Sequence, residues 1–178
     1  MRHARMRGYT LTEILVVIGV IAVLSLVSVP AFINYQQANV LRGAVRQLDG
    51  DLRQARMQAI TNNLTIRVEF AADNVTYSFY SSSDYGTTWT TYTAPRAFSS
   101  IRKLDKPVTV VGNTFRDVNG NGLRDIVFQP NGTLTTDCMA ASGPSAVGIG
   151  VPWTNVANNR YSIEITAVGQ VKDTASHS

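Results

Sequence analysis

The sequence contains very little cysteine and histidine. It has one cysteine, Cys138, and two histidines, His3 and His177, which lie at the two ends of the chain. A single cysteine excludes an intramolecular disulfide and therefore a disulfide-rich scaffold. Without histidine in the body of the chain, the usual general base for a serine or cysteine nucleophile is missing, as is a histidine metal cluster. We therefore expect a chain that is not an enzyme, with Cys138 as a lone, partly buried thiol.

Beyond the first residues, the sequence also has almost no excess of positive over negative charge. The formal net charge is +4, but Arg2, Arg5 and Arg7 all lie within residues 1–8. The remaining chain has 13 basic residues (16 minus 3) against 12 acidic residues, so it is nearly neutral. The basic character belongs to the start of the chain and is weak evidence for a nucleic-acid partner.

A long apolar run follows this basic start. Residues 14–41 carry no charge, and residues 14–33 are apolar over about the length that spans a bilayer as a helix. Basic residues before the run predict a cytoplasmic N-terminus and an external head. A removable secretory signal needs a shorter apolar core and a good cleavage site, and SLVSVPAF (residues 25–32) offers a poor one. The pattern favours a retained membrane anchor.

Glu13 lies at the leading edge of this run. Thr10 and Glu13 fit the S/T-x-x-E capping box, in which the glutamate reaches back to the backbone N–H of the cap residue. A carboxylate also suits the positive end of the helix dipole. On this pattern alone, Glu13 is either a helix cap or a residue with a specific function.

The residues around Glu13 resemble the leader of type IV pilins and type II secretion pseudopilins. A basic leader ends at Gly8, Tyr9 follows, and Glu13 and Pro30 are then the fifth and twenty-second residues of the shortened chain. In that family a prepilin peptidase cuts after the glycine, the new amine is methylated, and the fifth-position glutamate meets the N-terminal amine of a neighbouring subunit. The resemblance implies processing at Gly8 and Tyr9, and assembly through Glu13 and Pro30. Tyr9 departs from the family, which most often has phenylalanine there.

The same resemblance implies partners and a location. The partners are the prepilin peptidase, other pilin or pseudopilin subunits and the bacterial inner membrane. The chain is expected to cross that membrane once, with its N-terminus cytoplasmic and its head periplasmic, and then to enter a pilus or pseudopilus.

A second helical pattern begins after Pro30. Apolar residues recur there at spacings of three or four, which is typical of an amphipathic helix: Leu41, Val45, Leu48, Leu52, Ala55 and Ala59. We expect Pro30 to kink one long helix without ending it, and the helix to end at Asn62–Asn63. The apolar stripe needs a cover, and a globular head is the expected one.

Beyond residue 63 the sequence alternates as strands do. Strands are expected at residues 64–70, 75–81, 108–111, 126–129, 146–151 and 160–167, with a hairpin turn at 71–74 and a Ser/Thr-rich loop at 81–100. The predicted fold is α+β and pilin-like, a long N-terminal helix packed on an antiparallel β-sheet head. Its expected segments are a cleaved leader (1–8), a transmembrane and assembly helix (9–33), an amphipathic stalk helix (34–62) and the head (63–178).

Two stretches of the head resemble the GspH/FimT subfamily of minor pilins. DIVFQPNGTL (residues 125–134) and RYSIEITAVGQVK (residues 160–172) resemble its paired strands, in which a Phe-x-Pro-x-Gly segment and a later glycine recur. The resemblance implies a minor, low-copy subunit.

A polar loop at residues 117–125 resembles the start of a calcium-binding loop. Asp117, Asn119, Asn121 and Asp125 supply oxygen atoms at alternating positions, as a hard cation requires. The twelfth position is Phe128 where the bidentate glutamate is needed. The other interpretation is a polar turn rich in Asn-Gly pairs, which binds no ion. Ca²⁺ is the one cofactor that the sequence suggests, and no other is expected.

DNA is an alternative partner. Some FimT-like minor pilins are associated with DNA uptake through a Gly-Arg-x-Arg motif, but the corresponding residues Gly169–Lys172 keep only the charge of Lys172. Arg96, Arg102, Lys103 and Lys106 form a second basic group, which is more often a solvated face. The sequence therefore favours a structural minor pilin or pseudopilin. The alternatives are a DNA-binding minor pilin of a DNA-uptake pilus, and a membrane-tethered binding domain or enzyme that does not polymerise.

Overall fold

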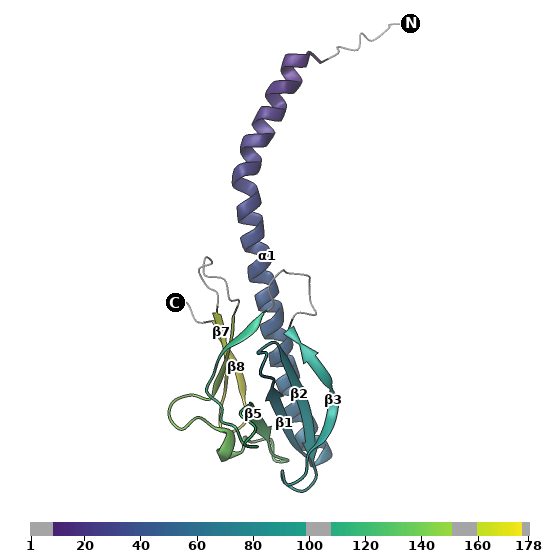
Figure 1. The fold of residues 1–178 in the computed structure, drawn as a ribbon, viewed down its shortest axis with the longest axis vertical. Coiled ribbons are helices and arrows are strands. Elements are labelled where there is room, and N and C mark those ends of the chain that lie inside the picture. Colours follow the sequence, from purple (N-terminus) through teal and green to yellow (C-terminus); the bar gives the residue numbers. More distant parts are fainter. Residues whose placement is uncertain (1–8, 99–107, 151–159, 176–178) are drawn as a thin grey trace, which may run out of the picture. The chain divides into compact units, whose positions relative to one another are not determined.

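The structure is a computed structural model that describes residues 9–98, 108–150 and 160–175. The chain forms two compact units, residues 1–37 and 38–178. Helix α1 (Leu11–Asn62) is the first element and contributes to both units (Figure 1). As predicted, the helix continues through Pro30. A kink at that residue stays a prediction.

Both ends of α1 have identifiable caps. At the start, the Thr10 hydroxyl oxygen accepts the backbone N–H of Glu13 at 3.3 Å, which is one half of the predicted capping box. At the other end, Asn63 adopts the left-handed conformation with φ of 52°. This turn lets the N–H of Leu64 donate to the carbonyl of Ala59 at 3.0 Å. The helix therefore ends at the predicted exit.

The part of α1 in the first unit exposes its apolar side chains. The aliphatic and phenylalanine residues that are more than half exposed are Leu11, Ile14, Leu15, Val16, Val17, Ile18, Val20, Ile21, Val23, Leu24, Leu26, Val29 and Phe32. Consecutive residues are exposed, so apolar surface faces several sides of the helix and not one stripe. Over the described residues, no helix combines the length and the apolar character that crossing a membrane requires.

The part of α1 in the second unit is amphipathic, as predicted. The six stripe residues, Leu41, Val45, Leu48, Leu52, Ala55 and Ala59, are all at most 4% exposed. They join one core with residues of both sheets, and every member of that core lies between Leu41 and Val171. The head thus contains its own core, which is the requirement for independent folding.

The first sheet has the order β3-β2-β1-β5 and is antiparallel throughout. Its strands are β1 (Thr65–Phe70), β2 (Thr76–Ser82), β3 (Thr90–Ala97) and β5 (Arg124–Phe128). The prediction of a loop at residues 81–100 was wrong, because β3 lies within that range. The side chains of β3 are mostly exposed, so the strand lacks the apolar alternation that marks a half-buried strand.

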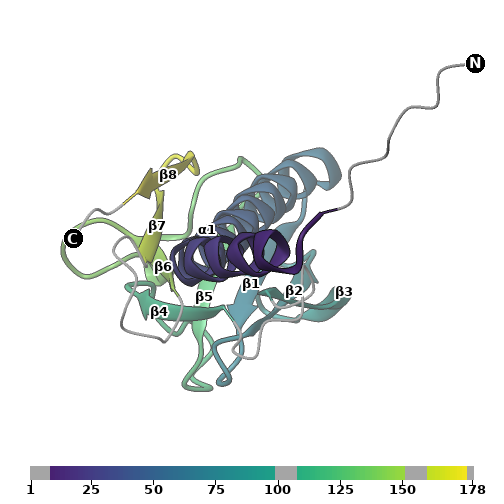
Figure 2. The same ribbon diagram turned by 90° about the horizontal axis from the view of Figure 1, so that it is seen from above.

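The second sheet has the order β4-β6-β7-β8 and is also antiparallel. Its strands are β4 (Thr109–Asn113), β6 (Ala146–Gly150), β7 (Arg160–Ile165) and β8 (Val171–Ala175), and a short 3-10 helix η2 (Thr136–Cys138) precedes β6. Figure 2 shows β7 and β8 on one side of the head and β2 and β3 on the other. The predicted α+β fold with an N-terminal helix and antiparallel sheets is confirmed.

Strand β1 is buried on both faces. Ile66, Val68 and Phe70 belong to the apolar core, while Arg67 and Glu69 on the other face are only 5% and 9% exposed. The central position of β1 in the sheet, between β2 and β5, places charged side chains in the interior.

Candidate functional site

The residues predicted to direct processing and assembly lie at the start of the described chain. Gly8 lies outside the described residues. Tyr9 is 80% exposed, and Glu13 is exposed at the first turn of α1. Pro30 lies within α1. The surface next to Glu13 is the apolar surface described above, so the single carboxylate stands at the edge of a surface that water solvates poorly.

Three of the residues predicted to bind calcium, Asp117, Asn119 and Asn121, lie in one loop, where their polar atoms hold the loop together. Asp125 lies in β5, which follows that loop. The Asp117 carboxylate accepts the backbone N–H groups of Asn119, Gly120 and Gly122 at 3.0, 2.7 and 2.6 Å. These hydrogen bonds, led by that of Gly122, lower the pKa of Asp117 below its usual value of 3.8. The side-chain amides of Asn119 and Asn121 donate to Glu69 of β1 at 3.2 and 2.8 Å.

Asp125 is the buried member of this group. It is 0% exposed, and one of its carboxylate oxygens accepts the N–H of Val118 at 3.0 Å. The other oxygen has no hydrogen-bond partner within the described residues. Burial raises the pKa of Asp125 from 3.8 to about 6, although the Val118 N–H and the nearby Arg67 act in the opposite direction.

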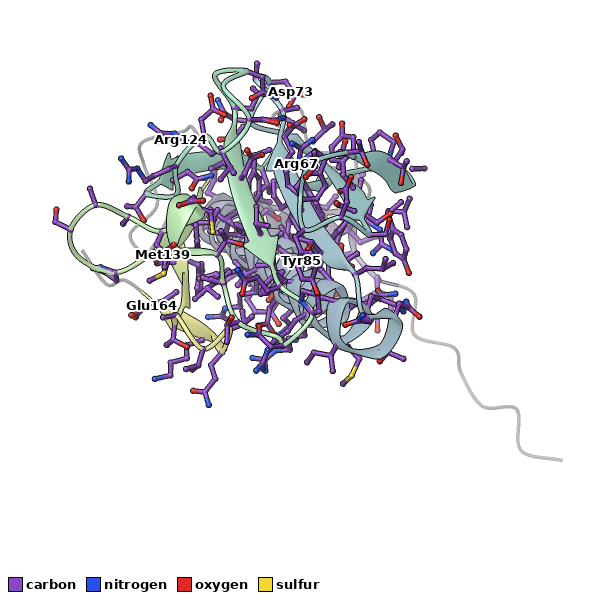
Figure 3. The ribbon with its side chains drawn as sticks, turned by 90° about the horizontal axis from the view of Figure 1, so that it is seen from below. Arg67, Asp73, Tyr85, Arg124, Met139 and Glu164 are labelled. Carbon is purple, nitrogen blue, oxygen red and sulfur yellow. The ribbon has the colours of Figure 1, made fainter. Side chains whose placement is uncertain are left out.

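Arg67 compensates the negative charge in this cluster. Arg67 is labelled in Figure 3. Its guanidinium lies 4.6 Å from the ring centres of both Tyr80 and Trp89, and 3.6 Å from the carboxylate of Glu69. Across residues 9–98, 108–150 and 160–175, no group of three or more His, Cys, Asp or Glu side chains is placed to hold a metal ion. Calcium binding at Asp117, Asn119, Asn121 and Asp125 stays a prediction.

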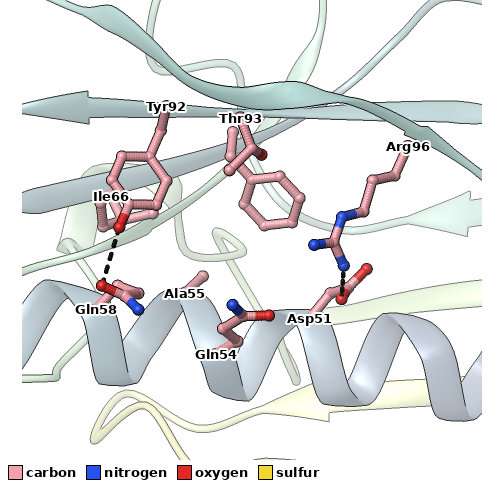
Figure 4. Close-up of a pocket in the computed structure, with 9 residues that line it drawn as sticks. Asp51, Gln54, Ala55, Gln58, Ile66, Tyr92, Thr93 and Arg96 are labelled. Carbon is pink, nitrogen blue, oxygen red and sulfur yellow. Dashed lines mark hydrogen bonds and ion pairs between the residues drawn. The ribbon is translucent and has the colours of Figure 1, made fainter.

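A second polar cluster lies under β3, where Figure 4 shows α1 facing that strand. Asp51 is 7% exposed, forms an ion pair with Arg96, and accepts the Tyr77 hydroxyl at 2.6 Å. Burial and the hydrogen bond to Asp51 raise the pKa of Tyr77. The adjoining cavity holds only about 20 Å³, room for roughly one water molecule. This cluster joins helix to sheet through the ion pair of Arg96, whose side chain is 40% exposed. A part for Arg96 in a DNA-binding patch stays a prediction.

The two stretches that resemble the GspH/FimT subfamily meet at α1. Arg56 donates to the carbonyl oxygens of Gly132 at 2.8 Å and Val168 at 3.0 Å. Gly132 and Gly169 have positive φ values of 79° and 74°. A Cβ at Gly169 would lie 2.0 Å from the Gly132 oxygen, so the two turns approach this closely only because residue 169 is glycine.

A groove of about 460 Å³ runs along this junction, between α1 and the turn that joins β7 to β8. Arg53 and Arg56 line it from the helix, Met57 and Ile60 add apolar surface, and Lys172 lies on the β8 side. Of the residues predicted to bind nucleic acid, Lys172 is therefore in a groove, while Arg102 and Lys103 lie outside the described residues. Arg53, Arg56 and Met57 were not predicted as site residues, and the sequence signal for the two arginines is only their basic charge at positions off the apolar stripe.

Cys138 is fully buried, so the expectation of a partly buried thiol was wrong in degree. Its thiol donates to the carbonyl oxygen of Thr135 at 3.0 Å. Burial raises the pKa of Cys138 from 9.0 to about 11, which keeps the sulfur protonated at neutral pH.

Comparisons with known proteins agree with the resemblance seen in the sequence. A family model described as type II transport protein GspH matches residues 44–169, more than half of the chain. The solved structure of the type IV minor pilin FimU of Pseudomonas aeruginosa is similar, with 15% identity, a TM-score of 0.50, and coverage of 78% of this chain and 90% of that chain.

The minor pseudopilin EpsH from the type 2 secretion system of Vibrio cholerae is also similar. It is 11% identical with a TM-score of 0.51, and the match covers 76% of this chain and 96% of that chain. At such identities the structural likeness shows a shared fold. Comparison with curated protein sequences gives no match.

Proposed function

The chain belongs to the GspH family, and from this premise we propose that it is a minor pilin or pseudopilin subunit that enters a filament through the N-terminal half of α1. The observation that carries this proposal is the exposed apolar surface of α1 between Leu11 and Phe32. The role is structural, and we propose no catalytic step.

The size of this apolar surface is the physical reason for assembly. Burying one Val, Leu, Ile or Phe side chain stabilises by about 1.5–3 kcal/mol. The side chains named above are each more than half exposed, so covering them together stabilises by an amount on the order of 10 kcal/mol. Because the apolar residues are consecutive, the cover has to surround the helix, as lipid or a bundle of neighbouring helices does.

Glu13 then has a role beyond capping. A carboxylate inside an apolar bundle requires a cation, because an unpaired buried charge is strongly destabilising. Cleavage after Gly8 would create an amine at Tyr9, four residues before Glu13 in each chain. We propose that the Glu13 carboxylate pairs with this amine of a neighbouring subunit and so sets the register between helices.

We also propose an inner-membrane stage before assembly. The uncharged run of residues 14–41 and the basic residues before it support a cytoplasmic N-terminus and a periplasmic head. This part rests on the sequence, since the described residues contain no helix that qualifies as a span. A prepilin peptidase acting at Gly8 would release the basic leader while the helix stays with the membrane.

The first experiment is to measure intact mass and N-terminal sequence of the chain expressed with and without a prepilin peptidase. The proposal predicts a product that begins at Tyr9 only when the peptidase is present. A chain that stays whole, or one cut near Ala31, would contradict the proposed processing.

A second experiment tests assembly itself. Glu13→Gln removes the charge but keeps the size and the exposed position, and it should reduce incorporation into filaments. Asp137→Asn, which removes a carboxylate from an exposed position in the head, is the control and should incorporate normally. Equal incorporation of both variants would contradict a role of Glu13 in assembly. Absence of the native chain from filaments would favour a tethered domain that never polymerises.

A further inference from the structure

We infer that the groove between α1 and the β7–β8 turn binds an acidic, extended segment of a partner protein. The groove is lined by Arg53, Arg56 and Lys172, and among the described residues no acidic side chain lines it. Its volume of about 460 Å³ is within the range of sites that hold a few side chains.

The groove is preformed by hydrogen bonds from its own arginines. Arg56 holds the turns at Gly132 and Val168, and Arg53 donates to the carbonyl of Val171 at 2.8 Å and to Asp49 at 3.0 Å. Both guanidinium groups are thereby fixed while their charge remains. A site fixed before binding loses little conformational entropy when a ligand enters.

The groove also offers apolar surface to its ligand. Met57 is 63% exposed and Ile60 is 45% exposed. Their exposure beside cations suits a segment that alternates acidic and apolar side chains. Such a segment fits an extended peptide, whose alternate side chains point to opposite sides.

The local charge favours a protein over a nucleic acid. Two acids lie beside the groove, Asp49 bonded to Arg53 and Glu164 opposite Lys172 in the β7–β8 ladder. Three cations and these two acids leave an excess of one positive charge (3 minus 2). One excess charge matches a carboxylate, whereas binding a nucleic-acid backbone requires neutralising several phosphates.

The inference rests on the proposed function only for the source of the segment, which would be another subunit of the same filament. The binding chemistry belongs to the groove itself. Binding is therefore measured on the isolated full chain in detergent, where no filament forms. A failure here leaves the proposed assembly role intact, and a failure of assembly leaves this measurement interpretable.

The probe is a fluorescent six-residue peptide of alternating leucine and glutamate, acetylated and amidated at its ends. Its matched control has glutamine in place of glutamate, and a 12-nucleotide single-stranded DNA is the competing ligand. At low salt, the glutamate peptide should bind at least about tenfold more tightly than the glutamine peptide, which corresponds to one favourable charge contact.

Two exposed positions test the site without disturbing the arginines that hold it. Lys172→Glu and Met57→Glu should each weaken binding of the glutamate peptide about tenfold. Arg116→Glu, a charge reversal at an exposed position outside the groove, should leave it unchanged. Circular dichroism of each variant confirms that the fold is kept.

Three results would overturn the inference. The first is equal affinity for the glutamate and glutamine peptides. The second is binding that Lys172→Glu and Met57→Glu do not weaken. The third is DNA binding that is tighter than peptide binding and is lost in Lys172→Glu, which would make the groove a nucleic-acid site.

Discussion

Replacing Asp125 with asparagine should stabilise the head at neutral pH, although it removes a charge beside Arg67. Burial raises the pKa of Asp125 from 3.8 to about 6, so the folded head binds a proton there more readily than the unfolded chain. Each unit of pKa corresponds to about 1.4 kcal/mol. The ionised carboxylate therefore reduces the free energy of unfolding by about 3 kcal/mol once the pH is well above 6.

The sign of this effect fixes its pH window. Below pH 3.8 Asp125 is protonated in both the folded and the unfolded state, so it does not reduce the free energy of unfolding. As the pH rises from 3.8 to about 6, the unfolded chain ionises first, and stability falls until the folded carboxyl ionises as well. Asp125→Asn removes this dependence, and the amide contributes an amount that does not change with pH. The advantage of the variant over the native head should therefore grow by about 2 kcal/mol between pH 4 and pH 7.5.

Urea unfolding of residues 38–178, followed by tryptophan fluorescence at pH 4 and at pH 7.5, measures this difference. Asp137→Asn is the control because it removes one carboxylate from an exposed position. The control should change the free energy of unfolding by a small amount that is similar at both pH values. The prediction is refuted if the gain in free energy of unfolding from Asp125→Asn does not grow with pH, or grows no more than the gain from Asp137→Asn. Burial would then not raise the pKa of Asp125.

Three further predictions concern the packing of the head. Tyr77→Phe removes the hydroxyl that donates to the buried Asp51, and should lower the free energy of unfolding by about 1–3 kcal/mol in the same urea assay. Gly169→Ala should destabilise by about 3 kcal/mol, since its Cβ would lie 2.0 Å from a backbone oxygen, whereas Gly120→Ala, with a similar positive φ and open space, should lose only about 1 kcal/mol. A smaller loss at Gly169 than at Gly120 would contradict the close approach of the two turns. Cys138 should react with iodoacetamide at least about a hundredfold more slowly in the folded head than in urea, because its pKa is raised from 9.0 to about 11.

The sequence predicts those elements whose apolar residues follow a regular period. The stripe from Leu41 to Ala59 and the alternating sequences of β1 and β2 are local patterns, and the structure confirms the helix and the two strands that they predict. Strand β3 has no such pattern, because at the edge of its sheet most of its side chains stay in water. Strand β8, at the edge of the other sheet, was missed although part of it lies in the stretch that resembles the family.

The polar clusters could not be predicted from local patterns at all. Asp51 and Arg96 are far apart in the sequence, and so are Arg56 and Gly132. Such pairs form only after the sheet packs on the helix, and a single sequence carries no record of which residues will meet. The motif glycines were visible as a resemblance, but their physical reason, two turns touching under Arg56, required the structure.

The burial of β1 on both faces has a consequence for how the head tolerates change. A strand at a sheet surface normally has every second position open to substitution, since those side chains contact only water. In β1, Arg67 and Glu69 occupy the positions that would be permissive, and both are enclosed by aromatic rings and the 117–122 loop. A scan of all substitutions at residues 65–70 would therefore find no tolerant set of alternate positions. A charge-conserving substitution such as Arg67→Lys should destabilise the head as much as a polar substitution at Val68 does. Both faces of β1, the apolar one and the one with Arg67 and Glu69, should therefore respond to mutation as core positions do.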